Sequence, residues 1–186
     1  MKPRAVFLDR DGVINRAFVR DGRPYPPKDV TELEILPQVL EALQALKADG
    51  FALIVVTNQP DVGRGTCSRD VVDAINDRLM TELPLDEVVT CFHNDTENCN
   101  CRKPKPGMLR MMEKQRNIDL SQSFVVGDRW RDIEAGIAAG CRTVFLDYGY
   151  AERNPAAQAD YVCKTLYQAA DWIKAAASVK APRASG

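Results

Sequence analysis

Residues 5–13 read Ala5-Val6-Phe7-Leu8-Asp9-Arg10-Asp11-Gly12-Val13, an apolar run that ends in two aspartates one residue apart. Such a run is typical of a strand covered on both faces, as in a parallel sheet. Gly12 allows a sharp turn after the second carboxylate. Two carboxylates this close need a partner, and Mg²⁺ prefers one or two carboxylates together with phosphate oxygens. The stretch therefore predicts a buried strand that carries a magnesium site, with a turn cap at Asp9 beside a solvated Asp11 as the alternative.

Length and composition limit the classes of protein that fit. The chain has 186 residues, of which 45% are hydrophobic, and a formal net charge of -1. This length suits a single domain, predicted over residues 1–178, with residues 179–186 as a flexible tail. The near-neutral charge gives no sign of a nucleic-acid or membrane partner. No apolar run reaches the length of a membrane span, and the N-terminus leads directly into a strand, so we expect a soluble, cytoplasmic monomer.

Apolar runs of strand length alternate along the chain with amphipathic segments of helix length. This alternation predicts an α/β fold in which helices cover both faces of a central parallel sheet. The predicted strands are residues 6–8, 52–56, 87–90, 124–126 and 143–146, with a weaker sixth at 161–163. The predicted helices are residues 37–48, 68–83, 107–116, 130–139 and 166–176. Pro37 suits a first helical turn, and Gly50 and Gly140 suit helix ends.

Polar residues follow the predicted strands at their C-terminal ends, where open α/β sheets bind ligands. The groups at these ends are Asp9 with Asp11, then Thr57-Asn58-Gln59, then Cys91-Phe92-His93, then Gly127-Asp128. Asp128 would complete a Mg²⁺ site with Asp9 and Asp11, and a helix cap is its alternative role. Asp132 would support neighbouring backbone or a basic group, or be an ordinary first-turn acid of the helix.

The only histidine lies among three of the six cysteines, in a C-x-H-x5-C-x-C pattern formed by Cys91, His93, Cys99 and Cys101. Three thiolates and one imidazole form a closed tetrahedral set, which predicts a structural Zn²⁺ site. The segment has almost no apolar residues, so zinc would hold it folded, and a chance cluster of free thiols is the alternative. The remaining cysteines are predicted to be small core residues: Cys67, Cys141 and Cys163.

A basic segment, Arg102-Lys103-Pro104-Lys105-Pro106-Gly107, follows these cysteines directly. Its prolines stiffen the chain, so its cations could be directed into the same crevice to neutralise a phosphoryl group. A solvated basic turn is the alternative.

Together these motifs resemble the haloacid dehalogenase superfamily of phosphatases. Its four signatures occur in order, as Asp9-Arg10-Asp11-Gly12-Val13, Thr57-Asn58-Gln59, Lys103, and Gly127-Asp128 with Asp132. The cysteine segment followed by Cys101-Arg102-Lys103-Pro104 resembles the capless, zinc-containing branch of that superfamily. The resemblance implies a three-layer Rossmann-like fold with a zinc-stabilised loop and no cap domain, and both Mg²⁺ and Zn²⁺ as cofactors.

The same resemblance implies roles for individual residues. Asp9 would be the nucleophile that forms an aspartyl phosphate, and Asp11 would protonate the leaving group and then activate water. Thr57 and Lys103 would hold the transferring phosphoryl group. The Mg²⁺ ligands would be Asp9, Asp128 and the backbone carbonyl of Asp11. The substrate's distal part would be reached by Arg102, with Asn58, Gln59 and Arg129 as weaker candidates.

The substrate implied by the resemblance is a phosphorylated sugar or a related ester. The zinc-containing branch includes phosphatases for D-glycero-D-manno-heptose 1,7-bisphosphate and for histidinol phosphate. The segment from Arg102 to Met108 resembles the heptose enzymes, which favours the bisphosphate, whereas the short spacing from His93 to Cys99 is closer to the histidinol type. A non-catalytic phosphosugar-binding protein would not need both aspartates, and a phosphomutase would need a lid. Residues 18–28 could line the pocket or face water.

Overall fold

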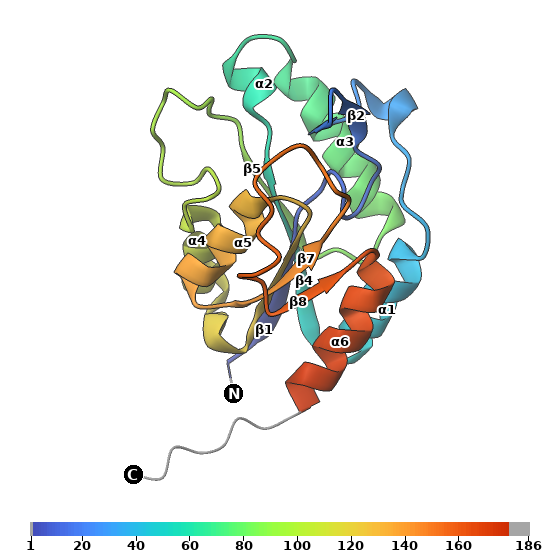
Figure 1. Ribbon diagram of the computed structural model, residues 1–186, viewed down its shortest axis with the longest axis vertical. Coiled ribbons are helices and arrows are strands. Elements are labelled where there is room, and N and C mark those ends of the chain that lie inside the picture. Colours follow the sequence, from blue (N-terminus) through green and yellow to red (C-terminus); the bar gives the residue numbers. More distant parts are fainter. Residues whose placement is uncertain (1, 179–186) are drawn as a thin grey trace.

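Six parallel strands form the centre of the structure, a computed structural model that describes residues 2–178 (Figure 1). Their spatial order is β5 (Glu87–Cys91), β4 (Phe51–Asn58), β1 (Arg4–Leu8), β6 (Phe124–Gly127), β7 (Arg142–Leu146) and β8 (Tyr161–Cys163). Every pairing between neighbouring strands of this sheet is parallel. The predicted parallel sheet is confirmed, including its weaker sixth strand.

Helices cover both faces of the sheet. In β1, Val6 and Leu8 join one apolar cluster, whereas Ala5 and Phe7 join a second cluster, because successive side chains of a strand point to opposite faces. The helices that contribute to the first cluster are α1 (Val39–Ala48), α3 (Arg69–Glu82) and α6 (Leu166–Ser178). Those that contribute to the second are α4 (Gly107–Arg116) and α5 (Trp130–Ala139). The result is the three-layer, Rossmann-like arrangement that the sequence implied (Figure 1).

A hairpin that the sequence analysis did not predict follows β1. It consists of β2 (Phe18–Arg20) and β3 (Arg23–Tyr25). Its turn is Asp21-Gly22, where φ is +50° and +71°, the left-handed conformation that Asp-Gly favours in tight hairpins. The Gly22 carbonyl accepts a hydrogen bond from the Ala151 N–H at 2.8 Å, and a Cβ at Gly22 would lie 2.6 Å from the Ala151 Cβ. Glycine at this position therefore lets the hairpin lie directly against the loop between β7 and β8.

The remaining elements are short: η1 (Val30–Glu32), α2 (Pro60–Gly63) and η2 (Leu120–Gln122). The resemblance implied a fold without a cap domain. Within residues 2–178, neither these short elements nor the hairpin form a separate domain over the sheet. None of the helices in that range combines the length and the apolar composition needed to span a lipid bilayer. The tail predicted at residues 179–186 lies outside the described residues.

Two details of the sequence analysis are wrong. Helix α1 begins at Val39 and not at Pro37, because Gln38 adopts a left-handed conformation (φ +61°) that cannot continue a helix from Pro37. Cys67 is only partly buried, since it precedes the N-cap Ser68 in the connection from α2 to α3. Cys141 and Cys163 are buried as predicted.

Candidate active site

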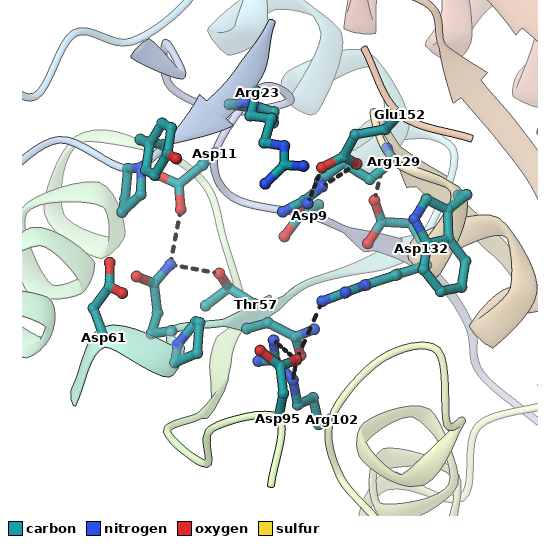
Figure 2. A pocket seen from close by; sticks show the side chains of 18 of the residues that line it. Asp9, Asp11, Arg23, Thr57, Asp61, Asp95, Arg102, Arg129, Asp132 and Glu152 are labelled. Carbon is teal, nitrogen blue, oxygen red and sulfur yellow. Dashed lines mark hydrogen bonds and ion pairs between the residues drawn. The ribbon is translucent and has the colours of Figure 1, made fainter. Parts of the chain in front are cut away.

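A pocket of about 510 Å³ opens beyond the C-terminal ends of β1, β4 and β6 (Figure 2). Its walls also include Arg23 and Tyr25 of the hairpin and Glu152 of the loop between β7 and β8, so part of segment 18–28 does line the pocket. Arg20 of that segment instead lines a smaller neighbouring cavity. The pocket joins buried carboxylates to an arginine wall, made of Arg64, Arg102 and Arg131, and its lining also includes Arg23, Arg129 and Arg153.

Asp9 and Lys103 form the buried centre of the site. Lys103 Nζ lies 2.8 Å from Asp9 Oδ1 and 2.6 Å from Asp132 Oδ1, and it also donates to the Val56 carbonyl at 2.7 Å. Burial opposes the charged ammonium, but Asp132 and Asp9 outweigh it and raise the pKa of Lys103 above its usual value. Burial also raises the pKa of Asp9 to about 6, with Lys103 acting in the opposite direction. A buried cation thus faces a carboxylate whose ionised form it stabilises.

Asp128 has the least compensated charge of the site. It is 1% exposed, and neither of its carboxylate oxygens has a hydrogen-bond partner among the described residues. Burial, followed by repulsion from Asp9 and Asp132, raises the pKa of Asp128 well above its usual value, and the nearby Tyr150 hydroxyl opposes this rise without forming a well-aligned hydrogen bond. Ligand oxygens of the three carboxylates lie within 4.8 Å of one another. Unpartnered buried carboxylate oxygens in this arrangement fit a hard divalent cation, and Asp9 and Asp128 are the residues with oxygens free to bind it.

Two supporting residues keep this centre compact. A Cβ on Gly12 (φ +90°) would lie 1.9 Å from Asp128 Oδ2, so only glycine lets the β1 loop approach that carboxylate. Asp132 accepts a hydrogen bond from the Arg129 N–H at 3.0 Å and also pairs with Lys103. Asp132 therefore supports both neighbouring backbone and a basic group, which were the two functions proposed for it from the sequence.

Asp11 lies at the edge of the pocket and is surrounded by donors. Its carboxylate accepts hydrogen bonds from Asn15 Nδ2 at 2.9 Å and Gln59 Nε2 at 2.8 Å, and it pairs with Arg10 at 3.1 Å. The Gln59 amide also donates to Thr57 Oγ1 at 2.9 Å, as the dashed lines in Figure 2 indicate. Sequence reasoning missed Arg10 and Asn15, because neither residue type at these positions signals a function by itself.

The Thr57-Asn58-Gln59 segment continues β4 into the site. Thr57 and Gln59 are 1% and 3% exposed, so both are held within the wall instead of projecting from it. The Asn58 amide donates to the Lys103 carbonyl and accepts from the Lys103 N–H, each at 3.1 Å. The structure thus brings Asn58 against the backbone of Lys103 and Gln59 against Asp11.

Arg102 lies on the pocket wall in a cluster of charges. Its guanidinium donates to Asp95 Oδ1 at 2.7 Å and 3.1 Å, and Arg64 lies 2.6 Å from Asp95 Oδ2. Arg131 reaches the same carboxylate at 3.6 Å. Two arginines from connecting segments and one from the first turn of α5 therefore converge on one aspartate, which the sequence analysis did not identify. On the other side of the pocket, Arg129 is paired with Glu152 (Figure 2).

The four predicted zinc ligands also converge. The three sulfurs of Cys91, Cys99 and Cys101 are 3.3 to 3.7 Å apart, and His93 Nδ1 lies 3.3 Å from the Cys101 sulfur. A tetrahedral ion with Zn–S bonds of 2.3 Å would separate sulfurs by about 3.8 Å, so the spacing fits such an ion. Burial raises the pKa of Cys91 to about 12, which means that a cation is needed to stabilise its thiolate.

Comparison with known proteins agrees with this geometry. Residues 100–169 match the Hydrolase_like family, described as HAD-hydrolase-like. The chain is 34% identical to a D-glycero-beta-D-manno-heptose-1,7-bisphosphate 7-phosphatase of Pasteurella multocida, over 92% of this chain and 97% of that protein. It is 33% identical to the protein of that name from Escherichia coli, over 91% and 93% of the two chains.

A solved structure gives the same picture. The crystal structure of D,D-heptose 1,7-bisphosphate phosphatase from B. bronchiseptica, complexed with magnesium and phosphate, superposes with a TM-score of 0.77. The two chains are 28% identical, and the match covers 93% of this chain and 99% of that one. Sequence, fold and pocket agree that this chain belongs to the haloacid dehalogenase-like hydrolases, in the family of the D-glycero-beta-D-manno-heptose-1,7-bisphosphate 7-phosphatases.

Proposed function

We propose that this phosphatase removes the 7-phosphate of D-glycero-D-manno-heptose 1,7-bisphosphate. The observation that carries the proposal is the division of one pocket into two parts of different charge. Asp9 lines one part, with Lys103 and the unpartnered Asp128 buried beside it, which suits the phosphoryl group that reacts. The other part is the arginine wall, which suits a phosphate that does not react. A substrate with two phosphates uses both parts.

The proposed reaction has two steps, and both use the carboxylates of Asp9 and Asp11. An Asp9 oxygen attacks phosphorus, the bond from phosphorus to the sugar oxygen breaks with its electron pair, and Asp11 gives its proton to that oxygen. Asp11 then takes a proton from water, which attacks the aspartyl phosphate and returns the electron pair to Asp9. Lys103, at 2.8 Å from Asp9, neutralises charge on the transferring group, and the Thr57 hydroxyl is a donor to it.

The proposed magnesium ligands are Asp9, Asp128 and the backbone carbonyl of Asp11. The ion would offset the negative charge that these carboxylates and the phosphate bring together. Support comes from the unpartnered oxygens of Asp128 and from magnesium in the B. bronchiseptica structure.

The second phosphate is assigned to the cluster around Asp95. Arg102 and Arg131 share this one carboxylate, and Arg64 divides its contacts between Asp95 and Asp61. Burial lowers the pKa of Arg131, and repulsion from Arg129 and Arg102 lowers it further; this repulsion indicates an excess of positive charge beside Arg131. A phosphate dianion would balance that excess. Asn58, Gln59 and Arg129 are weaker candidates for substrate contact, because their polar groups already bind Lys103, Asp11 and Glu152.

The cluster of Cys91, His93, Cys99 and Cys101 is proposed to hold a structural Zn²⁺, since all four positions of a tetrahedral ion are filled by protein atoms. We further propose a single domain over residues 1–178 that acts as a cytoplasmic monomer on a small phosphorylated sugar, without nucleic-acid or membrane partners.

Histidinol phosphate remains the second candidate, because the spacing from His93 to Cys99 resembles the enzymes that use it. It carries one phosphate and would leave the arginine wall unused. The test is a steady-state assay of phosphate release from histidinol phosphate and from both anomers of the heptose bisphosphate. The curated relatives are named for the beta anomer, so we expect the highest kcat/KM with that compound. A higher kcat/KM with histidinol phosphate would reject the proposed substrate.

A further inference from the structure

Arg10 lies between the two aspartates of the β1 end and is one of the largest side chains that the fold buries completely. Its guanidinium donates to both oxygens of Asp11, from Nε to Oδ1 at 3.3 Å and from Nη2 to Oδ2 at 3.1 Å. Its third nitrogen, Nη1, donates to Asn76 Oδ1 at 3.0 Å, and Asn76 in turn donates to Thr90 Oγ1 at 3.2 Å. Arg10 is therefore anchored to α3 and β5 while it contacts Asp11.

This buried charge has no explanation in stability or in substrate contact. Among the described residues, Asp11 is the only carboxylate that pairs with Arg10. A buried ion pair contributes little net stability, because desolvation offsets the attraction and apolar residues of similar size often do as well. The three guanidinium nitrogens of Arg10 already donate to Asp11 and Asn76, and the side chain is completely buried, so Arg10 is committed to protein groups and not to the phosphate. Its effect has to pass through Asp11.

The hydrogen bonds of Asp11 show how Arg10 limits where a proton can lie on the carboxyl group. Oδ1 accepts from Arg10 and Asn15, and Oδ2 accepts from Arg10 and Gln59, so each oxygen accepts two N–H groups. The amides of Asn15 and Gln59 can turn to present an oxygen, but a guanidinium has only donors. A proton on Asp11 must therefore lie on the side of the amides and the pocket, away from Arg10.

We propose that Arg10 is a positioning residue that orients the Asp11 carboxyl group toward the leaving oxygen of the substrate. The inference rests on the proposed function, in which Asp11 protonates that oxygen. Without the two contacts from Arg10, the carboxyl group would be held only by the amides of Asn15 and Gln59, which can turn, and it would meet the leaving oxygen less often. The resulting fall in kcat/KM would appear only with substrates whose leaving group needs a proton, because a stable anion departs without one.

The test compares two aryl esters of similar shape, phenyl phosphate and p-nitrophenyl phosphate, in the full chain with Mg²⁺. Phenolate is the more basic leaving group and depends more on protonation. The quantity to measure is kcat/KM, since it includes steps only up to departure of the phenol and is unaffected by hydrolysis of the aspartyl phosphate. Arg10→Met should lower kcat/KM for phenyl phosphate about 10- to 100-fold and leave p-nitrophenyl phosphate within about threefold. Arg10→Lys keeps the positive charge but cannot donate to both oxygens of Asp11 at once. Its kcat/KM for phenyl phosphate should lie between the values of Arg10→Met and the wild type.

Asn76→Asp tests the same inference with Arg10 in place, because a second carboxylate would compete with Asp11 for the guanidinium. It should cause a smaller loss that is again confined to phenyl phosphate. Asp11→Asn separates the two proposals. If Asp11→Asn affects both esters equally, the acid role of Asp11 is wrong and the inference about Arg10 fails with it. If Asp11→Asn is selective for phenyl phosphate but the Arg10 and Asn76 variants are not, only the positioning role is overturned.

Discussion

The two candidate metal clusters lie at the same edge of the sheet, but different parts of the fold hold them. Asp9 and Asp128 directly follow β1 and β6, whose parallel register, with Leu8 opposite Val126, fixes where they emerge. The cysteine cluster begins at the end of β5 but takes its other ligands from residues 92–106, which contain neither helix nor strand. The carboxylates therefore obtain their positions from the sheet, whereas the cysteine segment would depend on the proposed zinc ion for its shape.

Asp9→Asn should give the largest effect, because it removes the proposed nucleophile from a site whose geometry the sheet maintains. Turnover should fall by at least about four orders of magnitude, while the thermal unfolding temperature stays near that of the wild type. Phosphate release and calorimetry measure the two quantities. Asp73→Asn on the surface of α3 is the matched control and should retain full activity. Residual activity within tenfold of the wild type would reject Asp9 as nucleophile.

Cys99→Ser tests the cysteine cluster, because it removes one proposed zinc ligand from a segment that is expected to need the metal. We expect loss of bound zinc by mass spectrometry and a fall in Tm of roughly 5–10 °C, since 1 kcal/mol corresponds to about 2–4 °C in a chain of this size. Cys67→Ser, at a partly buried cysteine outside the cluster, should change neither quantity. Wild-type protein purified without any zinc would contradict the structural role.

Arg102→Ala tests how the cysteine segment contributes to substrate binding, since Arg102 connects this segment to the pocket through Asp95. It should lower kcat/KM for the heptose bisphosphate by roughly 1–3 kcal/mol, the scale of a charged hydrogen bond, and leave p-nitrophenyl phosphate nearly unchanged. Arg110→Ala, at an exposed arginine of α4, is the control. Equal losses on both substrates would place Arg102 at the reacting phosphoryl group instead.

In the absence of Mg²⁺, Asp128→Asn should change stability by a small amount, and the change should be favourable. The pKa of Asp128 is higher in the folded than in the unfolded chain, so the folded state binds the proton more tightly and loses stability as the pH rises above about 4. The amide removes that penalty. In EDTA at pH 7, the variant should melt a few degrees above the wild type, and Mg²⁺ should stabilise only the wild type. A lower Tm of the variant in EDTA would show that Asp128 is not a source of strain.

The sequence predicted the parts of the molecule that have strong local patterns. The strands beside Asp9, Thr57 and Asp128 are continuous apolar runs, and α4 and α5 match their predicted bounds. The hairpin was missed because each of its strands has only three residues, although Asp21-Gly22 is a hairpin signal. The contacts of Asp95 and Glu152 could not be predicted, since ion pairs between distant loops have no local pattern. The same holds for Arg10, whose burial depends on Asn76 of α3.

The contact between Gly22 and Ala151 has a consequence for engineering and for the divergence of specificity. The hairpin brings Arg23 and Tyr25 to the pocket, and the loop after β7 brings Glu152 and Arg153. Because Gly22 has no space for a side chain against Ala151, the two segments fit each other as a pair. Transplanting the hairpin alone into a relative would separate it from its supporting loop. A specificity graft should therefore move residues 18–28 together with the loop between β7 and β8.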